Sequence, residues 1–361
     1  MIFGEEIIED KFSEMLAQHS AYLYRASSHA SVEMQKVFSA EVRSMLGFMQ
    51  SALQGLSDAE LKALASGKYT TDKLKGVKQF VDGWQKSMAA KLPSEIKRQA
   101  IDLAEYESDF IARALGKATA TSKHSKLTGA ELWDVARSVP LTGGYLVDDM
   151  VGKISIGAKD TVLNTLRHGI TTGMSDSEII KALQGTEALN YTDSTLQAQK
   201  TSLTTVVRTL RTHISNQTYL QNYRDAGVKQ IAFVAVLDSR TSIVCASHDG
   251  EVYDIDEPFL IPPMHHNCRS LLKPVFGGKQ LGMRKANGSN GQKKVGANTN
   301  FATWFARQSE DFQREWLGAS RYELYKNGGY TLDRFVDPLN RTYSLQQLKA
   351  LDDKVFRELE L

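Results

Sequence analysis

Residues 237–270 read "LDSRTSIVCASHDGEVYDIDEPFLIPPMHHNCRS" and hold both cysteines of a 361-residue chain. Cys245 is followed by His248 in "CASH", and Cys268 is preceded by His265 in "HHNC". Two short Cys/His pairs on facing turns can supply the borderline-soft ligands of a tetrahedral zinc ion, and their separation falls in the range of two-knuckle zinc sites. The pattern therefore predicts that the two cysteines approach each other, with zinc as the candidate cofactor of all four side chains.

Other interpretations of the two cysteines stay open. Both could be small buried residues of a β-rich core, with His265 making a structural hydrogen bond. They could also form a disulfide, although two cysteines in so long a chain make no disulfide framework and suit a protein folded in a reducing cytosol. The distance between the two sulfurs is the first observation that separates these interpretations.

Charged residues surround the cysteines. "LDSRTS" places Asp238 and Arg240 at strand spacing, hence on the same side of the chain. Asp249 precedes Gly250 at a turn, and Arg269 follows the second cysteine. One interpretation is an acid–base or phosphate-binding site, and the other is an Asp–Arg network that ties together the turns of a small β-fold. We favour the network, because no nucleophile with an obvious base accompanies these residues.

The segments before this stretch set the fold class. Residues 1 to about 225 carry apolar side chains at helical spacing almost throughout. Residues 228–242 are β-branched and aromatic, as in a buried strand, and residues 249–256 predict a second short strand. We therefore predict a mainly α protein with a small β-rich module (α+β). We expect this module to pack on the last long helix near Leu210 and Ile214, because so small a sheet is not stable alone.

Four regions follow from these patterns. They are a helical N-terminal region of unassigned role (1–145), a module of helices followed by the β-rich part (146–276), a basic Gly/Asn/Lys linker (277–300) and a short helical C-terminal region (301–361). The formal net charge of +2 and the hydrophobic content of 42% are ordinary for a globular protein and do not indicate a nucleic-acid-binding protein. No apolar run is long enough to span a bilayer, and the acidic start lacks the basic region of a signal peptide.

All charged residues of the predicted linker are basic. It contains no Asp or Glu, and its basic residues are Lys279, Arg284, Lys285, Lys293 and Lys294. A flexible basic segment can follow a phosphate backbone without reading bases. These five residues are therefore candidate DNA contacts; alternatively, they keep a solvated linker soluble.

The stretch 237–270 resembles the C-terminal signature of phage minor head proteins, the head morphogenesis family of the phage Mu F-like kind. That signature is an Asp-x-Arg-Thr, a Cys shortly after it, a Gly-containing turn and a Pro-x-His-x-x-Cys-Arg ending. Here these are Asp238, Arg240, Thr241, Cys245, Gly250, Pro263, His265, Cys268 and Arg269. The preceding "GMSDSEIIKAL" and "YLQNYRDAGV" and the later "WFARQSEDFQREWLGASRYELYKNGG" are also similar, so the resemblance covers roughly 150–335. His248 matches the signature less well than His265.

The resemblance implies a minor structural protein of a tailed-phage virion rather than an enzyme. Such proteins act in procapsid assembly, enter the procapsid with the portal protein, and lie in the head interior near the portal and the packaged double-stranded DNA. The scaffold or major capsid protein is a further expected partner. Assembly is expected in the host cytoplasm, without a membrane. Some relatives carry an additional toxin domain, and none is apparent here.

Two other functions stay open from the residues. A histidine pair near an Asn and a Cys loosely resembles HNH-type metal-dependent nucleases, and the basic linker suits a general DNA-binding protein. An HNH site needs a histidine base and separate metal ligands on a ββα unit. Pro274 and Gly277 interrupt helical periodicity after Cys268, which counts against the nuclease.

Overall fold

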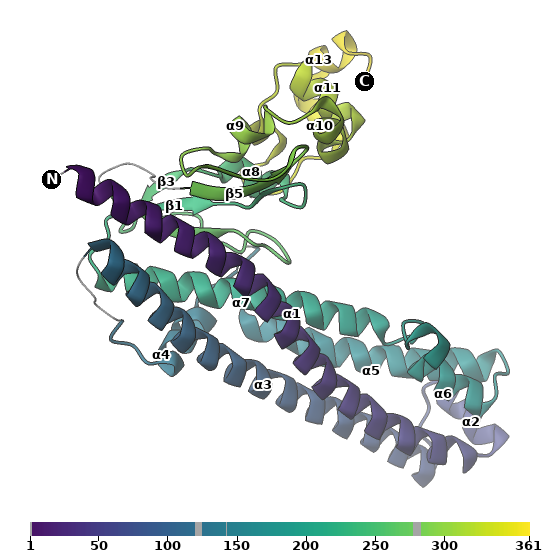
Figure 1. Cartoon of the computed structure of the whole chain (residues 1–361). Helices are drawn as coiled ribbons and strands as arrows, with labels where there is room; N and C mark the ends of the chain where they lie inside the picture. The colour runs from purple at the N-terminus through teal and green to yellow at the C-terminus, as the bar shows by residue number, and fades with distance from the viewer. Residues whose placement is uncertain (1, 120–124, 142, 277–282) are drawn as a thin grey trace. The chain divides into compact units, whose positions relative to one another are not determined.

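The computed structural model describes residues 2–119, 125–141, 143–276 and 283–361 (Figure 1). Helices account for 64% and strands for 9% of the chain, and the strands form two small sheets of three strands each. These proportions confirm the predicted mainly α fold with a small β-rich module. Within the described ranges, none of the helices combines the length and the apolar character that a membrane span requires.

Helices both precede and follow the strands. The preceding ones are α1 (Ile2–Gln54), α2 (Asp58–Ala65), α3 (Asp72–Thr119), α4 (Gly129–Ser138), α5 (Val147–Thr171), α6 (Asp176–Gln184), the 3-10 turn η1 (Glu187–Leu189) and α7 (Gln197–Asp225). The following ones are α9 (Phe301–Phe305), α10 (Glu310–Leu317), α11 (Ala319–Lys326), the 3-10 turn η2 (Leu332–Phe335), α12 (Leu345–Leu351) and α13 (Asp353–Glu358).

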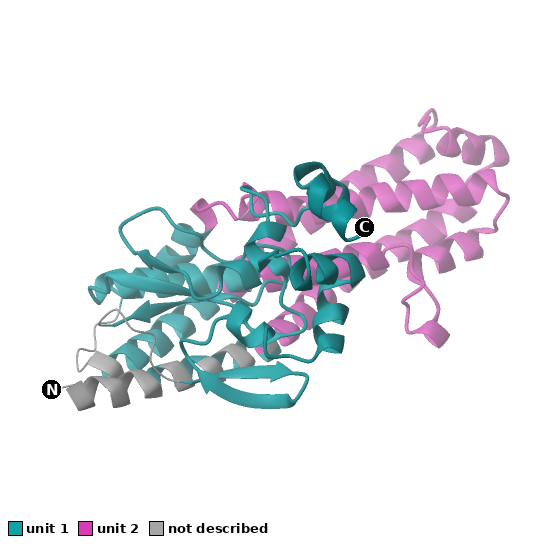
Figure 2. Ribbon diagram, turned by 90° about the horizontal axis from the view of Figure 1, so that it is seen from above, with its two compact units in different colours: residues 1–25, 102–136, 212–361 teal, residues 26–101, 137–211 magenta. Residues whose placement is uncertain are grey.

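The chain packs into two compact units, coloured in Figure 2. Unit 1 comprises Met1–Arg25, Asp102–Ala136 and Thr212–Leu361, and unit 2 comprises Ala26–Ile101 and Arg137–Arg211. The long helices α1, α3 and α7 each contribute residues to both units. The units therefore follow packing in space rather than the order of regions along the chain.

Unit 2 is made of helices that bury apolar side chains. Met34, Met45 and Met88 are fully buried in it, which is the role that an unbranched, adaptable side chain commonly has between helices. Ser175 and Glu178 form the capping box that opens α6, each bonding the backbone N–H of the other. Periodicity and capping, both visible in the sequence, thus account for where these helices lie and begin.

The first sheet, in unit 1, holds β1 (Gln230–Val234) between β3 (Val252–Asp254) and β4 (Leu271–Val275), and all pairs are antiparallel. Ile231, Ala232 and Phe233 of β1 are buried, as expected of a central strand. Pro274 lies opposite Ile231. It is tolerated because β4 is an edge strand, where a missing backbone donor breaks no ladder.

This sheet packs on the part of α7 that belongs to unit 1. Asn216 Oδ1 accepts a hydrogen bond from the Leu272 N–H at 2.9 Å, and the Tyr223 hydroxyl donates to the Leu272 carbonyl at 3.1 Å. The predicted helix is correct, and its contact with the β-rich module runs from Thr212, between Leu210 and Ile214, to Tyr223. Polar side chains decide the position, because they satisfy backbone groups of the edge strand β4 that the sheet leaves open.

A β-hairpin stands where composition predicts a linker. β5 (Met283–Gly288) and β6 (Gly291–Gly296) pair antiparallel, and β5 pairs in parallel with β2 (Leu237–Asp238) to form the second sheet. The linker prediction over 277–300 is therefore wrong for these strands. Only Ala286 of β5 is fully buried, so the hairpin shows almost none of the apolar alternation by which strands are recognised. We refer to residues 230–296, which contain the six strands found among the described residues, as the strand region.

The hairpin and the C-terminal helices share an aromatic core. Ala286 is buried with Phe301, Trp304 and Phe305 of α9. Gly288 passes so close to this core that an added Cβ would lie 2.0 Å from a Gln308 side-chain oxygen. Residues 301–361 are thus a short helical region, as expected, and one that packs against the hairpin.

Candidate metal centre

Two short segments of unit 1 carry the cysteines. Cys245 lies on α8 (Ile243–His248), whose N-cap residue Ser242 accepts a hydrogen bond from the Cys245 N–H at 3.1 Å. His265 and Cys268 lie in the loop between β3 and β4, where the Cys268 N–H donates to the His265 carbonyl at 3.2 Å. Asn267 takes the left-handed conformation (φ 57°), which Asn tolerates better than most residues. This turn presents the His265 and Cys268 side chains to α8.

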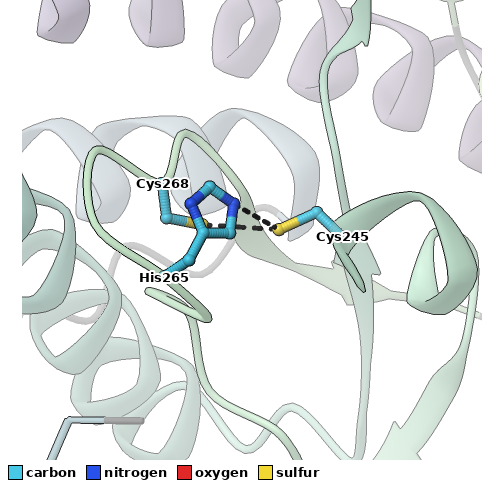
Figure 3. Close-up of side chains that lie close together, drawn as sticks. All are labelled: Cys245, His265 and Cys268. Atoms are coloured by element: carbon cyan, nitrogen blue, oxygen red, sulfur yellow. Dashed lines mark hydrogen bonds between the residues drawn. The ribbon is translucent and has the colours of Figure 1, made fainter. Parts of the chain in front are cut away.

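The ligand atoms of the three side chains face one another (Figure 3). Cys245 Sγ lies 3.2 Å from His265 Nε2 and 3.6 Å from Cys268 Sγ, and all three ligand atoms lie within 4.8 Å of one another. Both cysteines are free and only 2% exposed. The predicted approach of the two cysteines is confirmed, and their sulfurs are too far apart for a disulfide bond.

The His265 ring is oriented so that Nε2 faces the cysteine sulfurs and Nδ1 faces the backbone. His265 Nδ1 lies 2.8 Å from the carbonyl oxygen of His266. A ring nitrogen donates to a carbonyl only when it carries the proton, so in the neutral ring the lone pair belongs to Nε2. This is the tautomer, held by a backbone carbonyl, that metal-ligating histidines commonly have.

His248 points elsewhere, and the four-ligand prediction is corrected to three. Its Nδ1 lies 3.0 Å from a Glu251 carboxylate oxygen and its Nε2 lies 2.7 Å from Asn340 Oδ1. The hydrogen bond with Glu251 raises the pKa of His248. Among the residues that the structure describes, the His/Cys/Asp/Glu group around Cys245 contains only His265 and Cys268 besides it. Glu251 lies three positions from His248, but Asn340 lies 92 positions away and could not be identified as a partner from the sequence.

The two thiols differ electrostatically. The hydrogen bond with Cys268, followed by burial, raises the pKa of Cys245 well above its usual range. Burial also raises the pKa of Cys268, but hydrogen bonds with Cys245 and His265 outweigh it and hold that pKa well below its usual range. Burial lowers the pKa of His265, and its interaction with Cys268 reverses the balance. Position 268 therefore favours the thiolate, which is the form of cysteine that binds metals.

Asp238 is held by Arg269 rather than by its sequence neighbour. The Arg269 guanidinium makes two hydrogen bonds of 2.7 Å to the Asp238 carboxylate. The Arg240 guanidinium lies 3.6 Å away on a side chain that is 62% exposed, and Arg240 bonds this carboxylate through its backbone N–H at 3.0 Å. Thr241 adds a hydroxyl donor to the same carboxylate at 3.3 Å. Burial raises the pKa of Asp238, yet the hydrogen bonds with Arg269 outweigh it and leave the pKa below its usual value. These contacts match the Asp–Arg network interpretation.

A second ion pair, Asp249–Arg284, was not predicted. Arg284 makes contacts of 2.9 and 3.1 Å to the two carboxylate oxygens of Asp249, and the side chains are 11% and 0% exposed. The Ala235 N–H donates to the same carboxylate at 2.7 Å. Burial raises the pKa of Asp249 despite the guanidinium. The composition of the segment predicted that Arg284 contacts DNA. This prediction is wrong, because the guanidinium is buried against Asp249.

The remaining signature residues shape turns. Gly250 has a φ of 94°, and a Cβ there would lie 3.0 Å from the Cβ of Asn300, so both conformation and space call for glycine. Pro263 is buried and follows Pro262 through a cis peptide bond. The signature thus combines one Cys/His cluster, one carboxylate–guanidinium pair and the turns that position them.

The family model of phage Mu protein F-like proteins matches residues 160–273. Residues 160–273 are therefore similar to phage Mu protein F-like proteins. The matched range runs from α5 to β4, so it includes the Cys/His cluster and the Asp238–Arg269 pair but not the hairpin. No curated protein and no solved structure matches the chain. Phage Mu F-like proteins are structural proteins of phage heads, and the match indicates a head morphogenesis protein and virion component.

Proposed function

We propose that this chain is a minor structural protein of a tailed-phage head that acts in procapsid assembly in the head interior, next to the portal. The family match carries the proposal. The geometry of the signature supports it, because the carboxylates of Asp238 and Asp249 are both engaged by arginines. A buried carboxylate that is held in a two-point ion pair stabilises a fold and is poorly placed to exchange protons with a substrate.

Portal association is tested in assembling particles. Procapsids are purified from infected cells and treated with a short lysine-reactive cross-linker, and cross-linked peptides are identified by mass spectrometry. We expect peptides of this chain joined to the portal protein, with fewer links to the scaffold or major capsid protein. A chain that is abundant in the host extract but absent from procapsids and virions contradicts the proposal.

The hairpin is the part of the chain that we propose to lie against packaged double-stranded DNA. Lys285 and Lys294 are cross-strand partners, and Lys293 is exposed beside them. Exposed ammonium groups on neighbouring strands can contact a phosphate backbone without reading bases. The candidate contacts therefore narrow to these three lysines, since Arg284 faces inward and Lys279 lies outside the described residues.

A charge-matched pair of variants tests the DNA contact. One variant replaces Lys285, Lys293 and Lys294 by Gln, and the control replaces three exposed lysines of unit 2, Lys62, Lys68 and Lys97, by Gln. We expect weak, sequence-independent binding of wild type and control to duplex DNA at low salt, and a shallower salt dependence for the hairpin variant. Equal retention of all three proteins removes the hairpin from DNA binding and leaves the portal proposal standing.

The helix that an HNH-type nuclease site requires after its strands is not found among the described residues that directly follow Cys268. After Cys268 the chain enters the edge strand β4 (Leu271–Val275), where a ββα nuclease unit requires a helix. We therefore expect no cleavage when the purified chain is incubated with duplex DNA and magnesium, manganese or zinc. Cleavage that disappears in His265→Ala overturns the structural assignment.

A further inference from the structure

We propose that Cys245, His265 and Cys268 bind one zinc ion through three protein ligands, and that this ion joins α8 to the loop before β4. The phage Mu F-like assignment does not carry this inference, and the two are tested separately. It depends on the positions of three ligand atoms, on the hydrogen bonds behind them and on the burial of the sulfurs.

The spacing of the ligand atoms fits a single zinc ion. Zinc bonds of about 2.3 Å to sulfur and about 2.0 Å to nitrogen, arranged as a tetrahedron, separate two sulfurs by about 3.8 Å and a sulfur from a nitrogen by about 3.5 Å. The corresponding distances are 3.6 Å between Cys245 Sγ and Cys268 Sγ and 3.2 Å between Cys245 Sγ and His265 Nε2. These two distances lie within a few tenths of an ångström of the tetrahedral values, and the third pair, His265 Nε2 and Cys268 Sγ, lies within 4.8 Å.

Hydrogen bonds behind the ligands hold them in place. The His266 carbonyl accepts from His265 Nδ1, which directs Nε2 to the sulfurs. Ser242 caps the first turn of α8 through the backbone N–H of Cys245, and the Thr212 hydroxyl donates to the carbonyl of Cys268 at 2.8 Å. Supporting contacts of this kind fix the ring orientation and the ligand backbone, and they distinguish a built metal site from a chance cluster.

The chemistry of the donor set selects zinc. Two sulfurs and one imidazole are borderline-soft ligands, which suit zinc and poorly suit magnesium or calcium. Since no fourth His, Cys, Asp or Glu joins the group within the described parts of the chain, we assign the fourth position to a water molecule. Three protein ligands plus water also occur in catalytic zinc sites. Here the cysteines are buried, and the neighbouring carboxylate of Asp238 is engaged by Arg269, so the ion is assigned a structural role.

The ion would fix the segment that carries Arg269. Cys268 immediately precedes Arg269, whose guanidinium pairs with Asp238. Coordination of Cys268 from one side and its Thr212 hydrogen bond from the other leave little freedom to this turn. Loss of zinc is therefore expected to loosen the Asp238–Arg269 pair as well as the cluster itself.

The test measures metal in the full chain, produced and purified without chelator. We expect about one zinc per chain by plasma mass spectrometry, as for a single site of three protein ligands and a water molecule. Cobalt(II) that replaces the zinc is expected to give the thiolate-to-metal charge-transfer absorption of two bound cysteines. His265→Ala and Cys268→Ser should lose both the zinc and the absorption band.

Two histidine controls separate this site from other arrangements. His266→Ala removes an exposed side chain next to the cluster, and His248→Ala removes the residue of the four-ligand pattern that contacts Glu251 and Asn340. Both should keep the full zinc content. Equal loss of zinc in His248→Ala and His265→Ala overturns the three-ligand site in favour of four ligands.

If the cysteine variants fail to fold, metal binding is tested on the wild-type chain instead. Wild-type chain is stripped with a chelator and titrated with cobalt(II), and its unfolding temperature is recorded before and after. A charge-transfer band and a rise in unfolding temperature on metal return are expected. A stripped chain that gives neither, or purified wild type with two titratable thiols and no zinc, shows a plain buried thiol pair and overturns the proposal.

Discussion

Unit 2 and the strand region hold their elements together by different means. Unit 2 uses long helices with a methionine-rich core, and an ion pair such as Arg137–Asp148 lies on its surface, with side chains 49% and 57% exposed. The strand region has strands of two to six residues and encloses two ion pairs, Asp249–Arg284 at 0% and 11% exposure and Asp238–Arg269 at 10% and 19%. Short strands bury little apolar area, so polar contacts determine which turns meet. Substitutions of charged residues should therefore matter far more in the strand region.

The largest expected effect tests this contrast directly. Asp249→Asn keeps the shape of the side chain but leaves the Arg284 charge buried without a counter-charge, and we expect a loss of about 3–5 kcal/mol of unfolding free energy. The matched control, Arg137→Ala in unit 2, breaks an exposed pair and should cost about 0.5 kcal/mol. Hydrogen exchange of the β1 amides and chemical unfolding measure both. Similar losses in the two variants contradict the contrast.

A double substitution sharpens the same comparison. Burial raises the pKa of Asp249 even beside Arg284, so desolvation offsets much of the attraction within the pair. Asp249→Asn combined with Arg284→Met removes both charges, and it should therefore be much closer to wild type than Asp249→Asn alone. A double variant that is as unstable as the sum of the two single ones shows that Asp249 and Arg284 are not energetically coupled, and it contradicts this expectation.

Unit 2 should respond instead to the removal of apolar volume. Met45 is fully buried in its core, and Met45→Ala is expected to cost about 3 kcal/mol through lost burial and the cavity left behind. The effect should appear in the exchange of unit 2 amides and in helical circular dichroism. A loss below about 1 kcal/mol means that the core collapses around the smaller side chain.

Sequence reasoning succeeded where the deciding information is local. Helical periodicity and the Ser175–Glu178 capping box lie within one element, and the meeting of Cys245 with Cys268 follows from two nearby turns. The Phage Mu F-like signature added the assignment of the segment as a whole. These features need no knowledge of distant residues.

The failures share a physical cause, which is competition from residues far along the chain. His248 fits a zinc pattern by spacing, yet Asn340 takes its Nε2. Arg284 stands in a segment whose composition reads as a linker, and its partner Asp249 lies 35 positions away. A hairpin whose inward face offers one fully buried alanine gives no periodic signal, so neither its strands nor its inward arginine could be predicted.

The stability of the fold as a function of pH tests the Asp238–Arg269 ion pair, which is less buried than Asp249–Arg284. The pKa of Asp238 is depressed, so its contribution to stability is present above the ordinary carboxyl pKa of about 3.9 and is lost as the pH falls through the lower folded-state value. Asp238→Asn should cost about 2 kcal/mol at neutral pH, as for hydrogen bonds to charged groups. The gap between wild type and variant should narrow in acid below pH of about 4. A gap that stays constant with pH shows that the carboxylate charge does not stabilise the fold.

The smallest expected effect concerns the outer hairpin, where Lys285, Lys293 and Lys294 are exposed. Lys285 and Lys294 are cross-strand partners, so Lys285→Glu replaces a like-charged pair by an opposite pair and should stabilise the hairpin by about 0.3 kcal/mol. The same change adds negative charge where we propose DNA to lie, and it should weaken low-salt DNA retention more than Lys62→Glu in unit 2 does. Amide exchange in β5 and β6 measures the first effect and filter binding the second. If Lys285→Glu destabilises the hairpin, the two ammonium groups are held apart by other contacts, and the electrostatic argument for a phosphate beside them fails.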